Sequence, residues 1–274
     1  MRPTQVFILL ATSAACAGGA PPRDLSNAAL PVTNANAIAN THAVREVEPM
    51  TRVRELLAAP DRAPEDRALD ESRQAADLLT FLAVDRGMRV AELGCGRGYM
   101  TELLARAVGP GGGVVGQNAP AMLASPVETA WSARLSRPVD ANVVRVDRPF
   151  ADPFPPGTRG LDLVFLAIDY GQLVPFGVDR DAMNHAIHLA LRRGGRYVTL
   201  DETPREGSIT TDLRALHIDE SRNARREIES AGFVFAAEGR FLRDGADPRD
   251  WDANPGVPAK GEKRDRFVLV FTKP

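Results

Sequence analysis

The sequence predicts an α/β fold, in which a mostly parallel seven-stranded sheet with an antiparallel edge strand carries helices on both faces. Three observations predict it. Apolar runs of strand length alternate with segments of helical periodicity from about residue 88 to residue 232. A glycine-rich turn joins the first of these strands to the first helix. The last two strand-like runs follow one another without a helix between them, which favours an antiparallel pair at the sheet edge.

The individual elements follow from their apolar spacing. The folded domain is expected to start near Val44, and one or two short helices over residues 53–57 and 75–82, joined by a turn-like segment 59–67, precede the alternation. The expected strands cover 88–93, 112–118, 142–147, 161–168, 194–201, 233–242 and 266–272. The expected helices among them cover 99–108, 119–135, 179–191 and 218–232. A polar connection, Asp244 to Asp265, is long for a hairpin and fits either a floppy loop or a functional flap.

The composition is that of a globular protein, and it argues against a nonspecific nucleic-acid-binding protein and a disulfide-rich one. The 274 residues include 44% hydrophobic and 26% charged ones, which is enough to build one good core or two small ones. Lys plus Arg (34) nearly balance Asp plus Glu (36), so the chain lacks the basic field that binds nucleic acid without sequence preference. Cys16 and Cys95 are the two cysteines, and no disulfide framework can be built from them.

The N-terminus has the pattern of a bacterial export signal. One Arg precedes a short apolar run and small residues that lead to Cys16, so we expect a signal peptide over 1–15, a flexible tether over 16–43 and a domain over 44–274. The sequence before Cys16 is similar to a lipobox, so lipidation of Cys16 and plain cleavage near it both fit. The protein is then periplasmic or membrane-anchored through lipid; a misplaced start would make it cytoplasmic.

The glycine-rich turn reads Glu92-Leu93-Gly94-Cys95-Gly96-Arg97-Gly98. Glycines at this place let the backbone approach a ligand closely, and free amides at a helix start favour negative or polar groups. The third glycine comes one residue earlier than in the dinucleotide-binding fingerprint. That spacing disfavours a nicotinamide-dependent oxidoreductase.

The turn resembles the first motif of class I S-adenosylmethionine (SAM) methyltransferases, and later segments continue the resemblance. "PGGGVVGQNAPAM", "NVVRVDRPFADPFPPG", "GLDLVFLAIDYGQ", "LRRGGRYVTLDE" and "DRFVLVFTKP" follow in the order which that Rossmann-like fold requires. More narrowly, "GVDRDAMNHAI", "LHIDESRNARREIESAGF" and "FLRDGADPRDW" are similar to a bacterial family of uncharacterised methyltransferases, some with export signals. The likeness runs from about Val44 to Lys273 and implies SAM as the methyl donor.

The resemblance also implies which residues bind the donor. Glu92 matches the residue beside its amino acid end, and the loop beneath it consists of Gly94, Cys95, Gly96 and Gly98. Asn118 stands where such enzymes usually carry the Asp or Glu that accepts the ribose hydroxyls, and an amide lacks that charge. Asp147 matches the acceptor of the adenine amino group; a turn cap before Pro149 is the equal alternative.

The acceptor side is expected beyond the fourth and fifth strands, because open parallel sheets place their chemistry at the carboxyl ends of the strands. Asp169 and Tyr170 lie there in "DYGQ", where relatives carry a histidine, and a desolvated Asp169 could replace it as a base. His217 matches a histidine of the resembling family and is a catalytic or substrate-contacting candidate. Asp201 and Glu202 are comparable candidates.

Other polar residues are assigned structural roles. His185 and His188 lie on a helix with an inward apolar face, His42 lies in the tether, and Asp162 opens a strand. No cluster of His, Cys and carboxylates has zinc-like spacing, and no Gly-x-Ser-x-Gly turn is present, so neither a metal site nor a nucleophile triad is expected.

The sequence as a whole predicts a SAM-dependent methyltransferase for a small-molecule acceptor. An export signal conflicts with this, because SAM is made in the cytosol. The alternative is therefore an exported noncatalytic lipoprotein that uses the same fold to bind another ligand or a partner.

Overall fold

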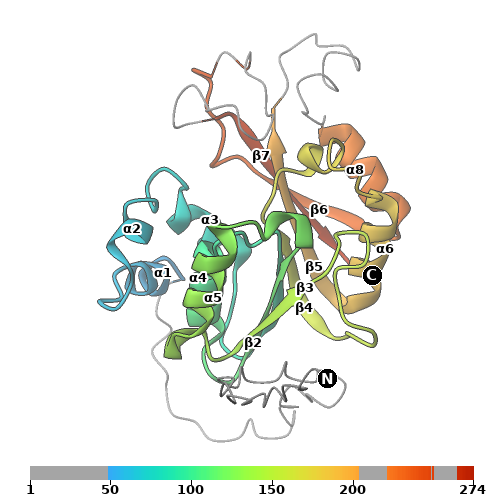
Figure 1. The fold of residues 1–274 in the computed structure, drawn as a ribbon. Helices are drawn as coiled ribbons and strands as arrows, with labels where there is room; N and C mark the ends of the chain where they lie inside the picture. Colours follow the sequence, from blue (N-terminus) through green and yellow to red (C-terminus); the bar gives the residue numbers. More distant parts are fainter. Residues whose placement is uncertain (1–48, 204–220, 248, 250–263) are drawn as a thin grey trace, which may run out of the picture.

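The computed structural model describes residues 49–203, 221–247, 249 and 264–274 (Figure 1). The signal peptide, Cys16, the tether, His42, His217 and most of the connection before Asp265 lie outside the described residues. The predictions about them stay predictions.

A seven-stranded sheet in the order β3-β2-β1-β4-β5-β7-β6 forms the centre of the molecule. Its strands are β1 (Arg89–Leu93), β2 (Gly113–Asn118), β3 (Val143–Asp147), β4 (Leu161–Leu166), β5 (Leu191–Glu202), β6 (Val234–Gly239) and β7 (Arg266–Thr272). The first five strands pair in parallel, whereas β7 pairs antiparallel with both β5 and β6. The predicted fold class is confirmed, and β7 is the antiparallel member, between β5 and the outermost strand β6.

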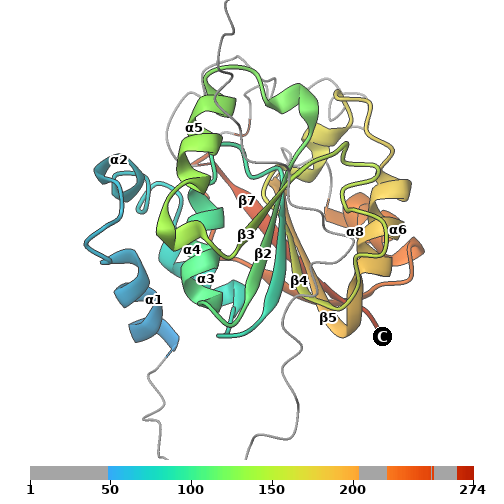
Figure 2. The ribbon, with the colours of Figure 1, turned by 60° about the horizontal axis from the view of Figure 1, so that its bottom comes forward.

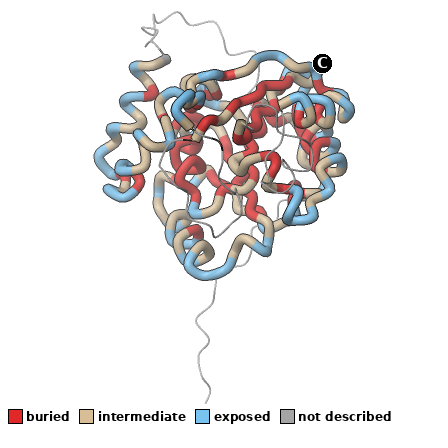
Figure 3. Tube along the Cα trace, turned by 90° about the horizontal axis from the view of Figure 1, so that it is seen from above, coloured by how far each residue is buried: buried red, intermediate tan, exposed pale blue. Residues whose placement is uncertain are grey.

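Helices cover both faces of the sheet, as Figures 1 and 2 show. One face carries α1 (Pro49–Leu57), α2 (Pro64–Arg67), α3 (Ala75–Leu82), α4 (Tyr99–Val108) and α5 (Val127–Leu135). The other carries α6 (Arg180–Ala190) and α8 (Ser221–Ser230). Three short 3-10 turns are η1 (Pro120–Met122), η2 (Pro138–Asp140) and η3 (Tyr170–Leu173). The sheet separates two apolar clusters, and its central strands are the most buried part of the chain (Figure 3).

The expected helix over 119–135 is wrong in its first half. After the single turn η1 the chain is irregular, and α5 begins at Val127, directly after Pro126. Proline has no backbone N–H and keeps the residue before it out of the helical region, so a helix can start after Pro126 but cannot run through it. The turn-like segment before α3 also contains the short helix α2.

The structural roles predicted for three polar residues are confirmed. Asp162 accepts hydrogen bonds from the backbone N–H of Arg89 and the side chain of Arg192, at 2.7 and 2.6 Å. His188 packs edge-on against Phe233, and His185 is exposed on α6. Within the described ranges, no helix is long and apolar enough to cross a membrane, and no three His, Cys or carboxylate side chains are placed to hold a metal ion.

Candidate functional site

The glycine-rich loop between β1 and α4 needs glycine for two different reasons. Gly94, Gly96 and Gly98 all have positive φ angles, of 75°, 54° and 81°. A Cβ at Gly98 would lie 2.5 Å from the ring of Trp131, so this glycine allows α5 to pack against the loop. A Cβ at Gly96 would meet nothing within 4 Å. Gly96 therefore faces open space, where a ligand can approach the backbone.

The end of β2 braces this loop. The Gln117 side chain accepts a hydrogen bond from the Gly94 N–H at 3.1 Å. Asn118 accepts from the Gly96 N–H at 2.8 Å and donates through Nδ2 to the Gly96 carbonyl at 3.0 Å. Asn118 is completely buried. The structure thus corrects the expectation that Asn118 faces a ribose, because both of its polar side-chain atoms hold Gly96.

A cavity of about 1060 Å³ opens at the carboxyl edge of the sheet beside the loop. Four of the predicted cofactor residues line it: Glu92, Gly94, Cys95 and Gly96. Gly98, Asn118 and Asp147 do not. Both oxygens of Asp147 accept from Arg145 Nε, and each oxygen retains a lone pair for a further donor. Cys95 is a buried free thiol whose pKa burial raises.

Glu92 is the buried acid of the cavity. Its side chain is 1% exposed and accepts a hydrogen bond of 2.5 Å from the Thr101 hydroxyl. Burial raises the pKa of Glu92 to about 7, against the lowering effect of Arg73 and Arg134. A ligand ammonium group next to this carboxyl would restore its charged form.

The N-terminal helices supply the opposite wall of the cavity, which the sequence motifs did not reveal. Arg73 lines the cavity and stacks over the Tyr99 ring, 4.5 Å from its centroid. The Tyr99 hydroxyl donates to Asp70 at 2.6 Å, and Arg62 makes two further bonds of 2.7 Å to Asp70. The Arg73 guanidinium has no hydrogen bond or ion pair to a described residue, so it can receive an anionic group.

A buried ion network fixes these helices to the loop. Glu102 on α4 is 1% exposed and accepts from three guanidinium groups, those of Arg106, Arg134 and Arg137. All three arginines reach the N-terminal segment: Arg134 pairs with Asp66 at 2.7 Å, Arg106 pairs with Asp61 at 2.9 Å, and Arg137 donates to the Asp61 carbonyl at 2.9 Å. The network joins residues that the sequence separates by more than thirty positions, which is why no local pattern predicted it.

The acceptor side contains a pair of carboxyl groups. Asp169 and Glu202 each lie three residues beyond the paired positions Leu166 and Thr199, so neighbouring strands bring them to the same edge. Asp169 Oδ1 and Glu202 Oε2 are buried and have no hydrogen-bond partner among the described residues. Burial raises the pKa of Asp169, and burial together with the Asp169 charge raises the pKa of Glu202 to about 8. The charges of Arg264 and Arg266 oppose both shifts.

Tyr170 is placed elsewhere, contrary to its predicted catalytic role. It is fully buried on the other face of the sheet, under Arg180, whose guanidinium lies 4.6 Å from the ring centroid. Its hydroxyl donates to Glu227 and accepts from Asn184, both at 2.9 Å. Asp201 points to that side too and accepts from the Gly171 N–H at 2.7 Å. Asp201 holds the η3 turn, because strand alternation directs it to the face opposite Glu202. Tyr170 fixes the same turn to α6 and α8 through its hydroxyl.

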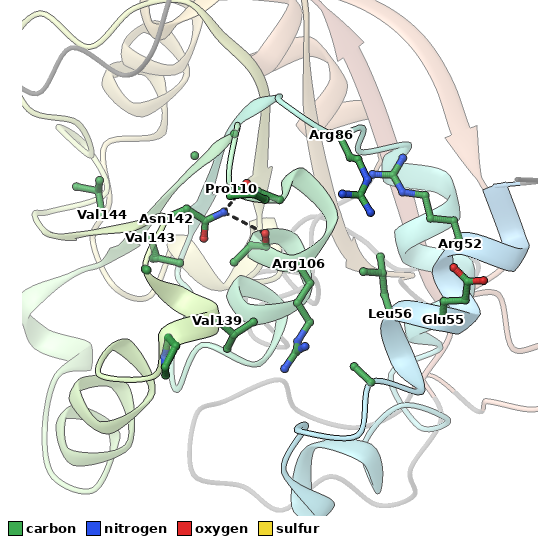
Figure 4. Close-up of a pocket in the computed structure, with 17 residues that line it drawn as sticks. Arg52, Glu55, Leu56, Arg86, Arg106, Pro110, Val139, Asn142, Val143 and Val144 are labelled. Atoms are coloured by element: carbon green, nitrogen blue, oxygen red, sulfur yellow. Dashed lines mark hydrogen bonds between the residues drawn. The ribbon is translucent and has the colours of Figure 1, made fainter. Parts of the chain in front are cut away.

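A second cavity, of about 770 Å³, lies at the opposite, amino edge of the sheet (Figure 4). Its polar groups satisfy the C-terminal carbonyls of α4. Asn142 donates to Ala105 and Gly109 at 3.1 and 2.9 Å, and Arg52 donates to Ala107 at 2.7 Å. None of the residues predicted to be functional lines this cavity.

The known proteins to which the chain is similar are methyltransferases. The profile of the protein-L-isoaspartate(D-aspartate) O-methyltransferase family matches residues 62–135, about a quarter of the chain. No curated protein matches the sequence. Solved structures similar to the chain include a SAM-dependent methyltransferase from Aquifex aeolicus, at 13% identity and a TM-score of 0.53 over 84% of this chain and 100% of the other.

Two further solved structures extend the comparison. The geranyl diphosphate C-methyltransferase of Streptomyces coelicolor is 18% identical, with a TM-score of 0.53 over 81% of this chain and 86% of the other. A Haloferax volcanii methyltransferase, crystallised with its Trm112 activator, is 14% identical, with a TM-score of 0.52 over 83% and 98%. The chain has the Rossmann-like class I methyltransferase fold. At these identities the likeness extends to the fold and not to the acceptor.

Proposed function

We propose that this protein is a SAM-dependent methyltransferase. The observation that carries the proposal is the position of the glycine loop: Gly96 and the buried acid Glu92 face one cavity at the carboxyl edge of a class I methyltransferase sheet. The partial match to a methyltransferase family profile covers this same loop.

The residues around the cavity fit the donor at its amino acid end. Glu92 would take the ammonium group, Arg73 the carboxylate, and the backbone of Gly94 to Gly96 would lie against the part between them. SAM supplies a methyl group on a sulfonium when it is bound. The ribose would lack the usual acidic partner, because Asn118 is engaged with Gly96.

The chain's own contribution to methyl transfer would be alignment. Transfer from a sulfonium needs the two reactants in line more than it needs covalent help. The ion network of Glu102 keeps the N-terminal helices, and with them Arg73, in place over the loop. A cavity of about 1060 Å³ suits SAM together with a small-molecule acceptor.

A second candidate function is an exported noncatalytic lipoprotein that uses the fold to bind another ligand or a partner. The burial of Asn118 favours it, because this chain offers the ribose no charged acceptor at that position. Export and lipidation of Cys16 belong to this proposal and to the first alike. Intact-mass measurement on protein from its native host tests them through the loss of about fifteen residues, with added lipid if Cys16 is modified.

The experiment that separates the two functions is thermal melting with S-adenosylhomocysteine, SAM and NADH. A ligand at a hundred times its dissociation constant stabilises the folded state by about 2.7 kcal/mol. We expect a clear rise in melting temperature with the first two and none with NADH. Gly96→Val should abolish the rise. Gly157→Val is the matched control, because Gly157 also has a positive φ and open space around its Cβ position but lies away from the cavity.

The proposed role of Arg73, binding the carboxylate of the methyl donor, is tested with a ligand that lacks the donor's amino acid end. Arg73→Ala should weaken S-adenosylhomocysteine binding at least tenfold and leave the binding of 5′-methylthioadenosine unchanged. Equal weakening of both ligands would show that Arg73 only supports Tyr99. If none of these adenosyl ligands changes the melting of folded wild-type protein at millimolar concentration, the methyltransferase proposal fails and the noncatalytic one takes its place.

A further inference from the structure

The carboxyl pair Asp169 and Glu202 has no structural task that would explain its free oxygens. Glu202 is 1% exposed, and Arg264 engages its Oε1, while Oε2 has no partner in the described part of the chain. Gln172 donates to Asp169 Oδ2 at 3.2 Å, and Asp169 Oδ1 likewise has no partner among these residues. Burying an unpaired carboxylate oxygen is costly, so a retained pair of them needs an explanation.

The pair lies beside the cavity of the glycine loop, although neither of its carboxyl groups lines the cavity. Leu200 lines that cavity, and Glu202, two residues further along β5, is on the same face of the sheet. Arg266 also lines the cavity and stands directly opposite Glu202 in the antiparallel pairing of β5 with β7. The pair is therefore next to the part of the cavity wall that Leu200 and Arg266 form.

Two adjacent carboxyl groups in a buried site share a proton more readily than they ionise together. Among the described residues, the charged groups around the pair are Arg264, Arg266 and Asp201. Arg264 engages Glu202, and Asp201 is turned to the other face, where it holds Gly171. Arg266 can stabilise the single negative charge of the pair. Such a pair is a proton acceptor that works near neutral pH.

We infer that Asp169 and Glu202 are the acid–base pair of the acceptor site, and that the acceptor is an uncharged or cationic nucleophile that must lose a proton, such as a hydroxyl, phenol or amine. This inference rests on the proposed methyltransferase function. The acceptor's X–H bond breaks, and its proton goes to the pair. The new X–CH₃ bond forms as the S–CH₃ bond breaks, and the electron pair of that bond stays on sulfur as the sulfonium becomes a neutral thioether. A carboxylate acceptor, as in the isoaspartate family, has no proton to lose and would be repelled by the pair.

The first test compares acceptors that share one ring. Protein shown by melting to bind S-adenosylhomocysteine is given methyl-labelled SAM with benzyl alcohol, phenol, benzylamine, benzoate or an isoaspartyl hexapeptide. We expect transfer to at least one of the first three and to neither carboxylate. Transfer to a carboxylate, or to none of the five while the donor binds, overturns the inference. Failure to bind S-adenosylhomocysteine instead refutes the proposed function.

The second test uses Glu202→Gln, which keeps an acceptor for Arg264 but cannot take a proton. We expect kcat to fall at least tenfold, with the affinity for S-adenosylhomocysteine unchanged within threefold. The wild-type rate should rise with pH as the pair acquires its single negative charge, and the midpoint of this rise should shift in the variant. Glu229→Gln is the matched control, because Glu229 forms a surface ion pair on α8. An unchanged kcat in Glu202→Gln overturns the inference.

A third measurement does not depend on turnover. The infrared spectrum of the protein at pH 7 should contain carbonyl bands of buried protonated carboxyl groups, one from Glu92 and one from the pair. Glu92→Gln identifies the first band, and Glu202→Gln and Asp169→Asn should each remove or shift the second. A spectrum that neither of these two variants changes would place the shared proton elsewhere.

Discussion

The two edges of the sheet carry cavities of comparable volume, about 770 Å³ at the amino edge and about 1060 Å³ at the carboxyl edge. They differ in how their polar groups are used. At the amino edge, Asn142 and Arg52 complete the hydrogen bonds of the α4 carbonyls. The buried oxygen that Asn142 leaves unpaired there, Oδ1, is neutral. Near the carboxyl edge, the buried carboxyl oxygens of Glu202 and Asp169 have no partner among the described residues, and the Arg73 guanidinium has no anion among them. A volume alone does not make a site, whereas unpaired charge around a volume indicates one.

The strongest way to disturb both cavities at once is to remove Glu102, because Arg106 lines the first and Arg134 and Arg137 line the second. Glu102→Ala should lower the free energy of unfolding by about 3–5 kcal/mol, since it leaves three arginines without their shared partner. Urea denaturation measures this. Glu229→Ala, at the surface of α8, should change stability by less than about 1 kcal/mol. Similar losses in the two variants would contradict the role of the network.

The buried Glu92 at the carboxyl edge should destabilise the folded protein at neutral and higher pH. The pKa of Glu92 in the folded protein, about 7, lies above its unfolded value. Its contribution to the free energy of unfolding is therefore fully present below about pH 4. It is lost as the pH rises through 7, because the buried carboxyl group then ionises. Glu92→Gln should stabilise the protein by up to about 3 kcal/mol at pH 8 and by almost nothing at pH 4. The same variant should bind S-adenosylhomocysteine at least tenfold more weakly. A pH-independent effect on melting would contradict the shift.

Asn118→Asp sharpens the comparison inside the loop. If Asn118 faced the ribose, an aspartate would strengthen the donor's binding. The structure predicts the opposite, because the new oxygen would replace the donor to the Gly96 carbonyl and repel it at a distance of about 3 Å. We expect the free energy of unfolding to fall by about 1–3 kcal/mol at pH 8, as measured by urea denaturation. The loss should shrink at low pH, because the carboxyl group then gains a proton that it can donate. Asn223→Asp on the exposed side of α8 serves as the control.

The smallest effect is expected at the amino edge. Asn142→Ala removes two hydrogen bonds to α4 carbonyls. Because water can enter the cavity and replace them, we expect the free energy of unfolding to fall by only about 1 kcal/mol. Binding of S-adenosylhomocysteine, measured by calorimetry, should not change. A tenfold change would mean that the two edges are coupled through α4.

The sequence by itself determined the fold class, the strands and most of the helices, because alternation of apolar runs with helical periodicity is a local signal that packing did not override. The loop from Glu92 to Gly98 was recognisable for the same reason, since three positive φ angles in a row of five residues require glycine. The broken helix before α5 shows where a local signal was overlooked, because Pro126 was present in the sequence.

Tertiary structure alone decided which side chains face the cavity. Asn118 and Tyr170 stand at the expected strand ends, but their hydrogen bonds go to Gly96 and to Glu227. Arg73 lies outside every quoted motif, and Arg266 was predicted only as part of the last strand; they reach the cavity from segments almost two hundred residues apart in sequence. A strand end fixes where a residue lies, whereas the direction of its side chain and its hydrogen-bond partners depend on neighbours that only folding brings together.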